Sequence, residues 1–241
     1  RPHFRYACHL VLGNRGYTVS SLNGFESAVF LYGPTWDAAS KVSKHHLAEY
    51  WAAQGIKVLF MEAPFHLLSL LTRPQEVKRL WRRFTAEPRQ VRPNLFITAA
   101  PILVPYRAGV PLVGMSAVLR LNQIIVRWKL RKACQKLGIS KPLVVVGSAT
   151  ADSLLSILHP SFVIYHCSDD YTRTPLFPKS YASLEQRLSA GVDLVVCTAE
   201  ALRQVKASLN PHTYTVTNGA QVEHFSRAQM SDVEPARELI K

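Results

Sequence analysis

The sequence predicts an α/β fold with a Rossmann-like, doubly wound and mostly parallel sheet. From Ser27 onward, short apolar runs alternate with helix-length amphipathic stretches, which is the pattern of βαβ units. Several of these runs are apolar throughout, as expected for strands that helices cover on both faces. A length of 241 residues suits one large α/β domain with extensions.

The expected elements alternate in order along the chain. The strands are Ala28–Tyr32, Ile56–Glu62, Leu95–Thr98, Leu143–Val146, Phe162–His166, Leu194–Cys197 and Tyr214–Thr217. The helices are Ser40–Gln54, Ser116–Leu137, Tyr181–Ala190 and Ala199–Leu209. Gly55 and Gly138 directly follow two of these helices, as C-terminal capping glycines do.

We expect the Rossmann-like domain to span residues 27–226. Residues 1–26 are rich in Gly, Asn, Arg and Ser without periodicity, and we treat them as an extension of unknown order. Residues 227–241 are polar and charged with one proline, which is typical of a linker.

Composition and charge exclude several classes of protein. Lys and Arg number 29 against 16 Asp and Glu, which gives a formal net charge of +13 and excludes an acidic or neutral surface. Hydrophobic residues make up 48% of the chain, which excludes disordered and collagen-like proteins. The four cysteines form no C-x-x-C pair, so we expect reduced thiols in a cytoplasmic protein. No apolar run has the length of a transmembrane helix or the form of a signal peptide.

The first candidate site follows the first strand, at Gly33–Asp37, and continues into the next helix. Ligands bind at the carboxyl ends of strands in open α/β sheets, where helix N-termini direct N–H groups at anions. The alternative is structural, with Trp36 packed and Asp37 or Ser40 capping the helix. The chain has no G-x-G-x-x-G and no Walker A loop. The candidate pocket residues are Trp36, Asp37, Lys44 and His45.

The second candidate site follows the expected strand Phe162–His166. The strand runs directly into a histidine and two adjacent carboxylates, His166, Asp169 and Asp170. A carboxylate or histidine at this edge can take a proton from an attacking hydroxyl, and two carboxylates can alternatively hold a divalent metal. The structural alternative is that one aspartate caps the following turn and His166 makes a buried hydrogen bond.

Two later features are expected to be architectural. Thr198 follows the strand Leu194–Cys197 and is expected to cap the next helix. Asn218 and Gly219 form a tight-turn dipeptide after the last strand.

Two basic stretches hold much of the positive charge. Thr72–Arg92 has seven Lys or Arg and two acidic residues, with interleaved apolar side chains. Arg120–Lys136 is the second, and Val118, Leu121, Ile125 and Trp128 lie at helical spacing with basic residues around them. Such helices bind anionic membrane surfaces, serve nucleic acids, or form a solvated face. Nucleic acid is disfavoured because no RRM, KH or zinc-finger signature is present.

Four segments resemble the amino-terminal half of a GT-B glycosyltransferase, of the nucleotide-sugar-dependent class that builds bacterial exopolysaccharides and related cell-surface glycans. They come in the family's order and lie within residues 28–226. The segments are GPTWDAASKVSKHHLAEYWAAQGIKVLFMEAP, VIYHCSDDYT, LEQRLSAGVDLVVCTAEAL and TVTNGAQVEHF. This chain departs from the family's Asn-Gly-Val-Asp turn, because Gln221 stands where the family has the aspartate.

The resemblance implies a first domain that binds the acceptor and a second domain that binds the nucleotide sugar, without an obligatory metal or other cofactor. The donor-binding domain is not in this sequence, and Asn218 and Gly219 would lead toward it. The resemblance places Trp36, Asp37, Lys44 and His45 on the acceptor side of the cleft. His166, Asp169 and Asp170 are the candidates for the base or for an orienting group. Asp170→Asn is expected to lower turnover greatly in a complete enzyme while leaving the fold intact.

The expected partners are therefore a nucleotide sugar, a glycan or lipid-linked acceptor, and an anionic membrane surface at the inner face of the plasma membrane. Two other classes of protein stay open. One is a non-catalytic subunit that pairs with a separate donor-domain protein. The other is a nucleic-acid-binding Rossmann domain that uses Arg82 and Arg83 on phosphates.

Overall fold

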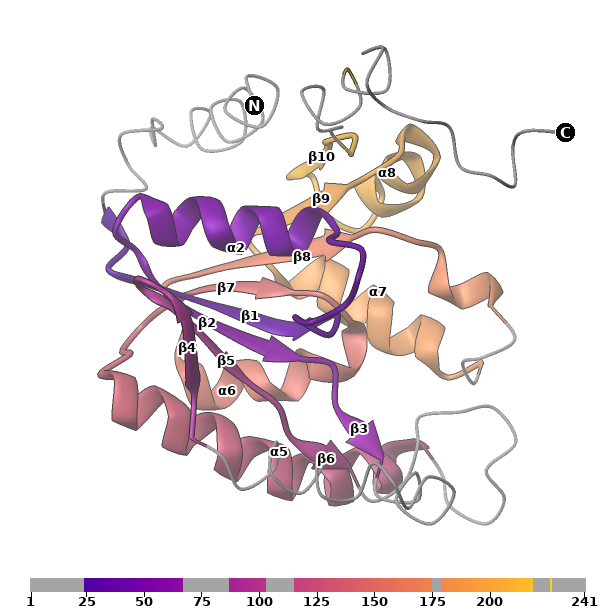
Figure 1. Cartoon of the computed structure of the whole chain (residues 1–241). Helices are drawn as coiled ribbons and strands as arrows, with labels where there is room; N and C mark the ends of the chain where they lie inside the picture. The colour runs from indigo at the N-terminus through magenta and orange to yellow at the C-terminus, as the bar shows by residue number, and fades with distance from the viewer. Residues whose placement is uncertain (1–23, 67–86, 103–114, 175–178, 219–225, 227–241) are drawn as a thin grey trace, which may run out of the picture.

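The strand order of the main sheet establishes the fold class. The structure is a computed structural model, and it describes residues 24–66, 87–102, 115–174, 179–218 and 226. Eight strands pair in the order β10-β9-β8-β7-β1-β2-β5-β4 (Figure 1). All neighbours are parallel except β4, which runs antiparallel to β5. The predicted α/β, Rossmann-like, doubly wound sheet is therefore confirmed. The expected extension before residue 24 and the expected linker after Ser226 lie outside the described residues.

The strands agree closely with the apolar runs of the sequence. They are β1 Ser27–Gly33, β2 Lys57–Glu62, β4 Arg89–Arg92, β5 Leu95–Thr98, β7 Leu143–Val146, β8 Phe162–Cys167, β9 Leu194–Cys197 and β10 Thr213–Thr215. A second sheet pairs β3 Phe65–His66 with β6 Pro101–Ile102. The sequence did not predict β3, β4 or β6, because two of them are only two residues long and β4 consists mainly of polar residues.

The helices lie on both faces of the sheet (Figure 1). They are α2 Ser43–Ala53, α5 Met115–Leu137, α6 Leu155–Leu158, α7 Tyr181–Gly191 and α8 Glu200–Ala207. Single 3₁₀ segments at Ala149–Leu154 and Tyr171–Arg173 follow β7 and β8. Gly55 and Gly138 adopt positive φ angles of 90° and 64° just after α2 and α5, as the C-cap prediction required.

The N-caps of two helices differ from the prediction. α2 begins at Ser43 and not at Ser40, because Val42 is its N-cap and the Val42 N–H donates to Nδ1 of His45 at 3.1 Å. Neither Asp37 nor Ser40 caps this helix. α8 begins at Glu200 with Ala199 as its N-cap, so the prediction that Thr198 caps it is wrong.

The sheet separates two apolar cores. On one face, α2 packs Leu47 and Trp51 against alternate residues of β1, β2 and β5. On the other face, α5 and α7 pack Leu130 and Leu188 with the remaining residues of the same strands. Alternation along each strand distributes the side chains between the two cores. In the described part of the chain, no helix has both the length and the apolar character needed to cross a membrane.

The topological switch point lies between β1 and β7. From β1, the next strand in sequence, β2, lies on one side, and β7 begins the run toward β10 on the other. Open α/β sheets bind ligands outside the carboxyl ends of the strands at this point, because the loops diverge there to opposite faces. This edge is therefore the first place to look for a functional site.

Candidate active site

Strained backbone marks the carboxyl end of β1, and a close backbone approach marks the carboxyl end of β7. Tyr32, the penultimate residue of β1, has a φ of 59°, in the left-handed region that a bulky residue adopts at a cost of about 1–3 kcal/mol. Gly147 follows β7 and donates its N–H to the Leu31 carbonyl at 2.8 Å. A Cβ at residue 147 would lie 2.7 Å from the Tyr32 carbonyl oxygen, so only glycine fits here.

Lys44 extends from the first turn of α2 across this switch point. Its Cε lies 3.2 Å from where a Cβ of Gly147 would be, so the lysine stem passes over the glycine. The Nζ donates to Oγ of Ser168, in the loop after β8, at 3.3 Å. Burial lowers the pKa of Lys44, and the charge of Asp169 opposes this shift. A buried cation therefore joins α2 to the loop after β8.

His166 is a second buried titratable group at this edge. Its Nδ1 has no hydrogen-bond partner among the residues that the structure describes. Burial lowers the pKa of His166 to about 3, and the charge of Lys44 adds to the effect. The imidazole is therefore neutral at pH 7, and its unpaired Nδ1 provides a polar atom at the candidate site.

The two predicted carboxylates have different surroundings. Asp169 is exposed, and its Oδ2 accepts a hydrogen bond from the Tyr171 hydroxyl at 3.1 Å. Asp170 caps the turn that follows, since its Oδ1 accepts from the Thr172 N–H at 3.2 Å and from the Thr172 hydroxyl at 2.5 Å. The hydrogen bond from the Thr172 hydroxyl is the main reason that the pKa of Asp170 is lowered.

Thr198 fixes the backbone of the loop that carries Ser168 and Asp169. Its hydroxyl donates to the Ser168 carbonyl at 2.9 Å, and its N–H donates to the Cys167 carbonyl at 3.1 Å. The residue that the sequence assigned to a helix cap is thus a bridge between the ends of β8 and β9.

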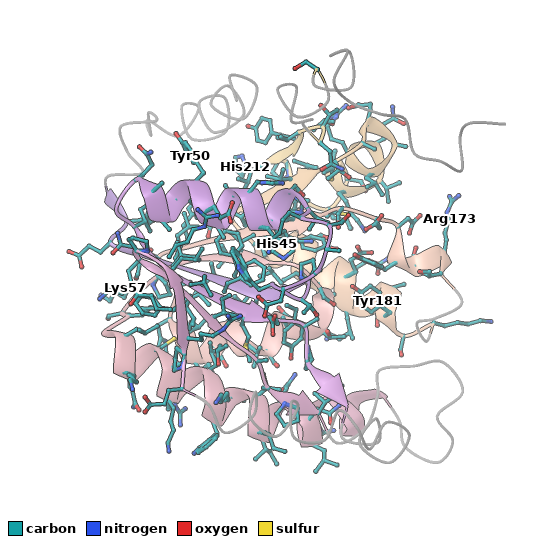
Figure 2. The ribbon with its side chains drawn as sticks, in the orientation of Figure 1. His45, Tyr50, Lys57, Arg173, Tyr181 and His212 are labelled. Atoms are coloured by element: carbon teal, nitrogen blue, oxygen red, sulfur yellow. The ribbon has the colours of Figure 1, made fainter. Side chains whose placement is uncertain are left out.

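Two residues at the same edge were missed by the sequence analysis. The Tyr181 hydroxyl at the start of α7 accepts from the Ala149 N–H at 3.2 Å and lies 3.4 Å from Oγ of Ser148 (Figure 2). Burial raises the pKa of Tyr181 to about 12, so the phenol stays protonated at neutral pH. The place of Ser148 just after β7 was a usable signal, but no local pattern indicated Tyr181.

His45 and Trp36 support the loop that leads into α2. The buried His45 ring stacks on Phe60 with centroids 5.3 Å apart, and its Nε2 donates to the Thr35 carbonyl at 3.3 Å. Figure 2 shows His45 between α2 and the sheet. Trp36 is also buried against Phe60, and its backbone N–H donates to Oε1 of Glu62 at 2.6 Å. These contacts fix the loop that leads into α2, and Lys44 lies in the first turn of that helix.

The remaining predicted residues lie apart from Lys44. Asp37 is exposed and pairs with Arg89 of β4 at 2.8 Å. Asn218 is exposed at the end of a described range, and Gly219 lies outside the described residues. The structure therefore gathers Lys44, His166 and Asp169, places Trp36 and His45 behind them, and leaves Asp37 with β4.

A metal site was the other interpretation of the carboxylate pair. Within the described ranges, no three His, Cys, Asp or Glu side chains are grouped closely enough to hold a metal ion together. Cys134, Cys167 and Cys197 are buried free thiols, and Cys8 lies outside the described residues.

The buried His166 predicts a pH-dependent stability. Because its folded pKa of about 3 lies below the unfolded value of about 6.5, the unfolded chain binds the extra proton between these limits. The free energy of unfolding should therefore fall as the pH is lowered through this window, by up to about 1.4 kcal/mol per pH unit from this group. Urea denaturation of the wild type and of His166→Gln at several pH values measures the difference.

The control for this experiment is His46→Gln, which removes an exposed histidine of α2. We expect His166→Gln to have a shallower slope than either the wild type or His46→Gln, with the buried His45 supplying part of what remains, since burial lowers its pKa too. Equal slopes for the wild type and His166→Gln would contradict the neutral, buried state of His166.

The comparisons with known proteins find distant similarity among solved structures. No protein-family model matches the sequence, and no curated protein matches it. Among solved structures, a chain of sucrose-phosphate synthase from Thermosynechococcus elongatus is similar, with a TM-score of 0.48 and 10% sequence identity. The match covers 84% of this chain and 94% of that one. A similarity of this extent does not assign an activity.

Proposed function

We propose that this chain is the acceptor-binding half of a glycosyltransferase that moves a sugar from a nucleotide-sugar donor to a hydroxyl of a glycan or lipid-linked acceptor. The observation that carries the proposal is the contact between Lys44 and Ser168. These residues are 124 positions apart and belong to two of the segments that resemble the family. Their meeting point is the ligand-binding edge of this fold class.

Asp169 is the proposed general base. In the transfer, the acceptor oxygen forms a bond to the anomeric carbon, the bond from that carbon to the diphosphate breaks, and the hydroxyl proton goes to Asp169. His166 is buried with a pKa of about 3, which makes it a poor proton acceptor near pH 7. The oxygens of Asp170 are engaged by Thr172 and Arg173. Asp169 is exposed, and its carboxylate accepts one hydrogen bond, from the Tyr171 hydroxyl, among the residues that the structure describes.

Lys44 is the proposed electrostatic group. A cation in a poorly solvated place stabilises developing negative charge far better than one in water, and departure of the diphosphate develops such charge. Burial of Lys44 supplies that environment. Trp36 and His45 fix the loop before it, so their proposed contribution to acceptor binding is to shape that side of the site. The donor-binding domain that the resemblance implies would face this edge.

The proposal is tested by sugar transfer with the full-length protein. A panel of UDP-, GDP- and dTDP-sugars is combined with soluble glycans and lipid-linked saccharides, and mass spectrometry detects acceptors that gain one sugar. Lys44→Met should lower kcat/KM on the order of 100-fold, because a preorganised charge is lost. Lys179→Met, which removes an exposed lysine in the turn before α7, is the matched control and should change little.

Turnover that is insensitive to Lys44→Met would contradict the role of this lysine. Absence of transfer with every donor, together with stable co-purification of a separate donor-domain protein, would instead support the non-catalytic subunit.

A further inference from the structure

Helix α5 has a buried side and an apolar outer side. Val126, Leu130 and Ala133 are buried against the sheet. Leu121, Ile124 and Trp128 have 43%, 67% and 49% of their surface exposed. They are three of the five large hydrophobic side chains that are exposed among the described residues. An exposed cluster of this kind on a monomer marks an interaction surface.

The three exposed side chains form one stripe along α5. They are three and four residues apart, the spacing that places side chains on one face of a helix. Ile124 and Trp128 are each two residues from Val126, so they point about 200° away from the buried side around the helix axis. The sequence analysis placed Ile125 in this stripe, but Ile125 is half-buried and Ile124 lies at its centre.

Basic side chains flank the stripe on both sides. Arg120 and Arg131 are exposed on one side, and Lys132 is exposed on the other. The Lys132 Nζ lies 4.5 Å from the centre of the Trp128 ring. No acidic residue occurs anywhere in Met115–Leu137. The outer face of α5 is therefore an apolar stripe between cations. It consists of six exposed residues, Arg120, Leu121, Ile124, Trp128, Arg131 and Lys132.

We propose that the outer face of α5 binds the surface of an anionic lipid bilayer. Leu121, Ile124 and Trp128 would enter the boundary between headgroups and acyl chains, and the basic side chains would reach the lipid phosphates while their stems stay on the apolar side. Each cation near an anionic surface adds about 1 kcal/mol of attraction. The proposal does not depend on the sugar-transfer activity.

The chemistry of the stripe favours a bilayer over a nucleic acid. A nucleic-acid groove places cations against phosphates and aromatic rings against bases, and aliphatic side chains have no partner there. Here the centre is aliphatic, because Ile124 is the most exposed of the three apolar residues. The face also lies on the opposite side of the sheet from α2 (Figure 1). In a protein bound to a bilayer through this face, the sheet would therefore lie between the bilayer and α2.

The test is co-sedimentation of the purified protein with vesicles of phosphatidylcholine alone or mixed with phosphatidylglycerol. The wild type should bind the mixed vesicles and not the zwitterionic ones. The double variant Ile124→Ser/Trp128→Ser should bind the mixed vesicles at least about tenfold more weakly. The matched control is Val205→Ser on α8, which removes a hydrophobic side chain that is 59% exposed and should leave binding unchanged.

A second pair of variants tests the charges. Arg131→Gln/Lys132→Gln should weaken binding and reduce its dependence on salt, since two screened attractions are lost. The control Arg173→Gln/Lys179→Gln removes two exposed charges outside α5 and should keep the wild-type salt dependence more closely. Urea denaturation confirms that each variant is folded.

Three results would overturn the proposal. The first is a wild type that binds neither kind of vesicle or binds both equally. The second is unchanged binding by Ile124→Ser/Trp128→Ser. The third is duplex DNA that displaces the vesicles and binds the wild type and the apolar double variant equally, which would assign the basic surface to nucleic acid.

Discussion

Asp169→Asn is expected to reduce sugar transfer on the order of 1000-fold, the range in which removal of a general base acts. The amide keeps the size of the side chain but accepts no proton, so the acceptor hydroxyl must lose its proton to water. The hydrogen bond from Tyr171 is retained in the variant, because an amide oxygen also accepts it. Steady-state kcat with the donor and acceptor found in the panel measures the loss.

Asp170→Asn is the matched control for this prediction. It makes the same isosteric change one residue further along, where the carboxylate caps a turn and pairs with Arg173 at 3.1 Å. Its expected effect is about tenfold or less, since a cap and an exposed ion pair together stabilise the turn by about 1 kcal/mol. The opposite order of the two variants would identify Asp170 as the base.

Lys206→Met is expected to lower the free energy of unfolding by about 3–5 kcal/mol. The Lys206 Nζ lies 2.7 Å from Oε2 of Glu185, and the two side chains are only 8% and 1% exposed. Oε1 of Glu185 accepts the Tyr165 hydroxyl at 2.5 Å. Removal of the lysine leaves a buried carboxylate without a counterion, which costs far more than the pair itself contributes. Urea denaturation at pH 7 measures the change.

Two further variants make this prediction specific. Glu185→Gln/Lys206→Met removes both charges and should recover most of the lost stability, because no unpaired ion remains. Arg203→Met on the same helix breaks the exposed pair with Glu200 and should lower the free energy of unfolding far less than Lys206→Met does, because solvent screens an exposed pair. A double variant as unstable as Lys206→Met would show that packing of the lysine stem, and not the ion pair, is responsible.

Local patterns predicted the parts of the fold that local physics determines. The strands β5, β7 and β9 have the predicted bounds. β7 and β9 are apolar runs that polar or turn residues end on both sides. β4 was missed because an antiparallel edge strand of sequence RQVR has one face and one edge in water, so it carries no apolar signal. β4 is a strand because it pairs with β5, and no pattern within its own four residues indicates that pairing.

The start of α2 shows why helix caps are harder to predict than helices. The residues Asp37 and Ser40 have the usual capping side chains, but the helix begins after Val42. The imidazole of His45 accepts the N-cap N–H, and this ring is held by stacking on Phe60 of β2. The cap thus depends on Phe60, a residue of β2 that lies outside the stretch of sequence around the start of α2.

The sequence indicated which edge of the sheet to examine for a site, but not how the side chains pack there. The carboxyl edge of the sheet followed from the fold class, and Lys44, His166 and Asp169 do lie together there. Trp36 and His45 lie behind the site because they are buried beside the core on the α2 face of the sheet. Which side chains the two cores bury is known only from the packed structure. Tyr181 joined the site through a contact with the turn after β7 that has no sequence signature.

The ends of the sheet also bear on how this protein avoids aggregation. A sheet edge with unpaired backbone groups is a template for adding strands from other molecules, and exposed charge on the edge opposes this. At one edge, β4 exposes Arg89 and Arg92, so an added strand would have to bury or displace two cations. At the other, β10 is only three residues long. The long apolar strands in the centre are thus kept from intermolecular pairing by two short edges that are poor templates.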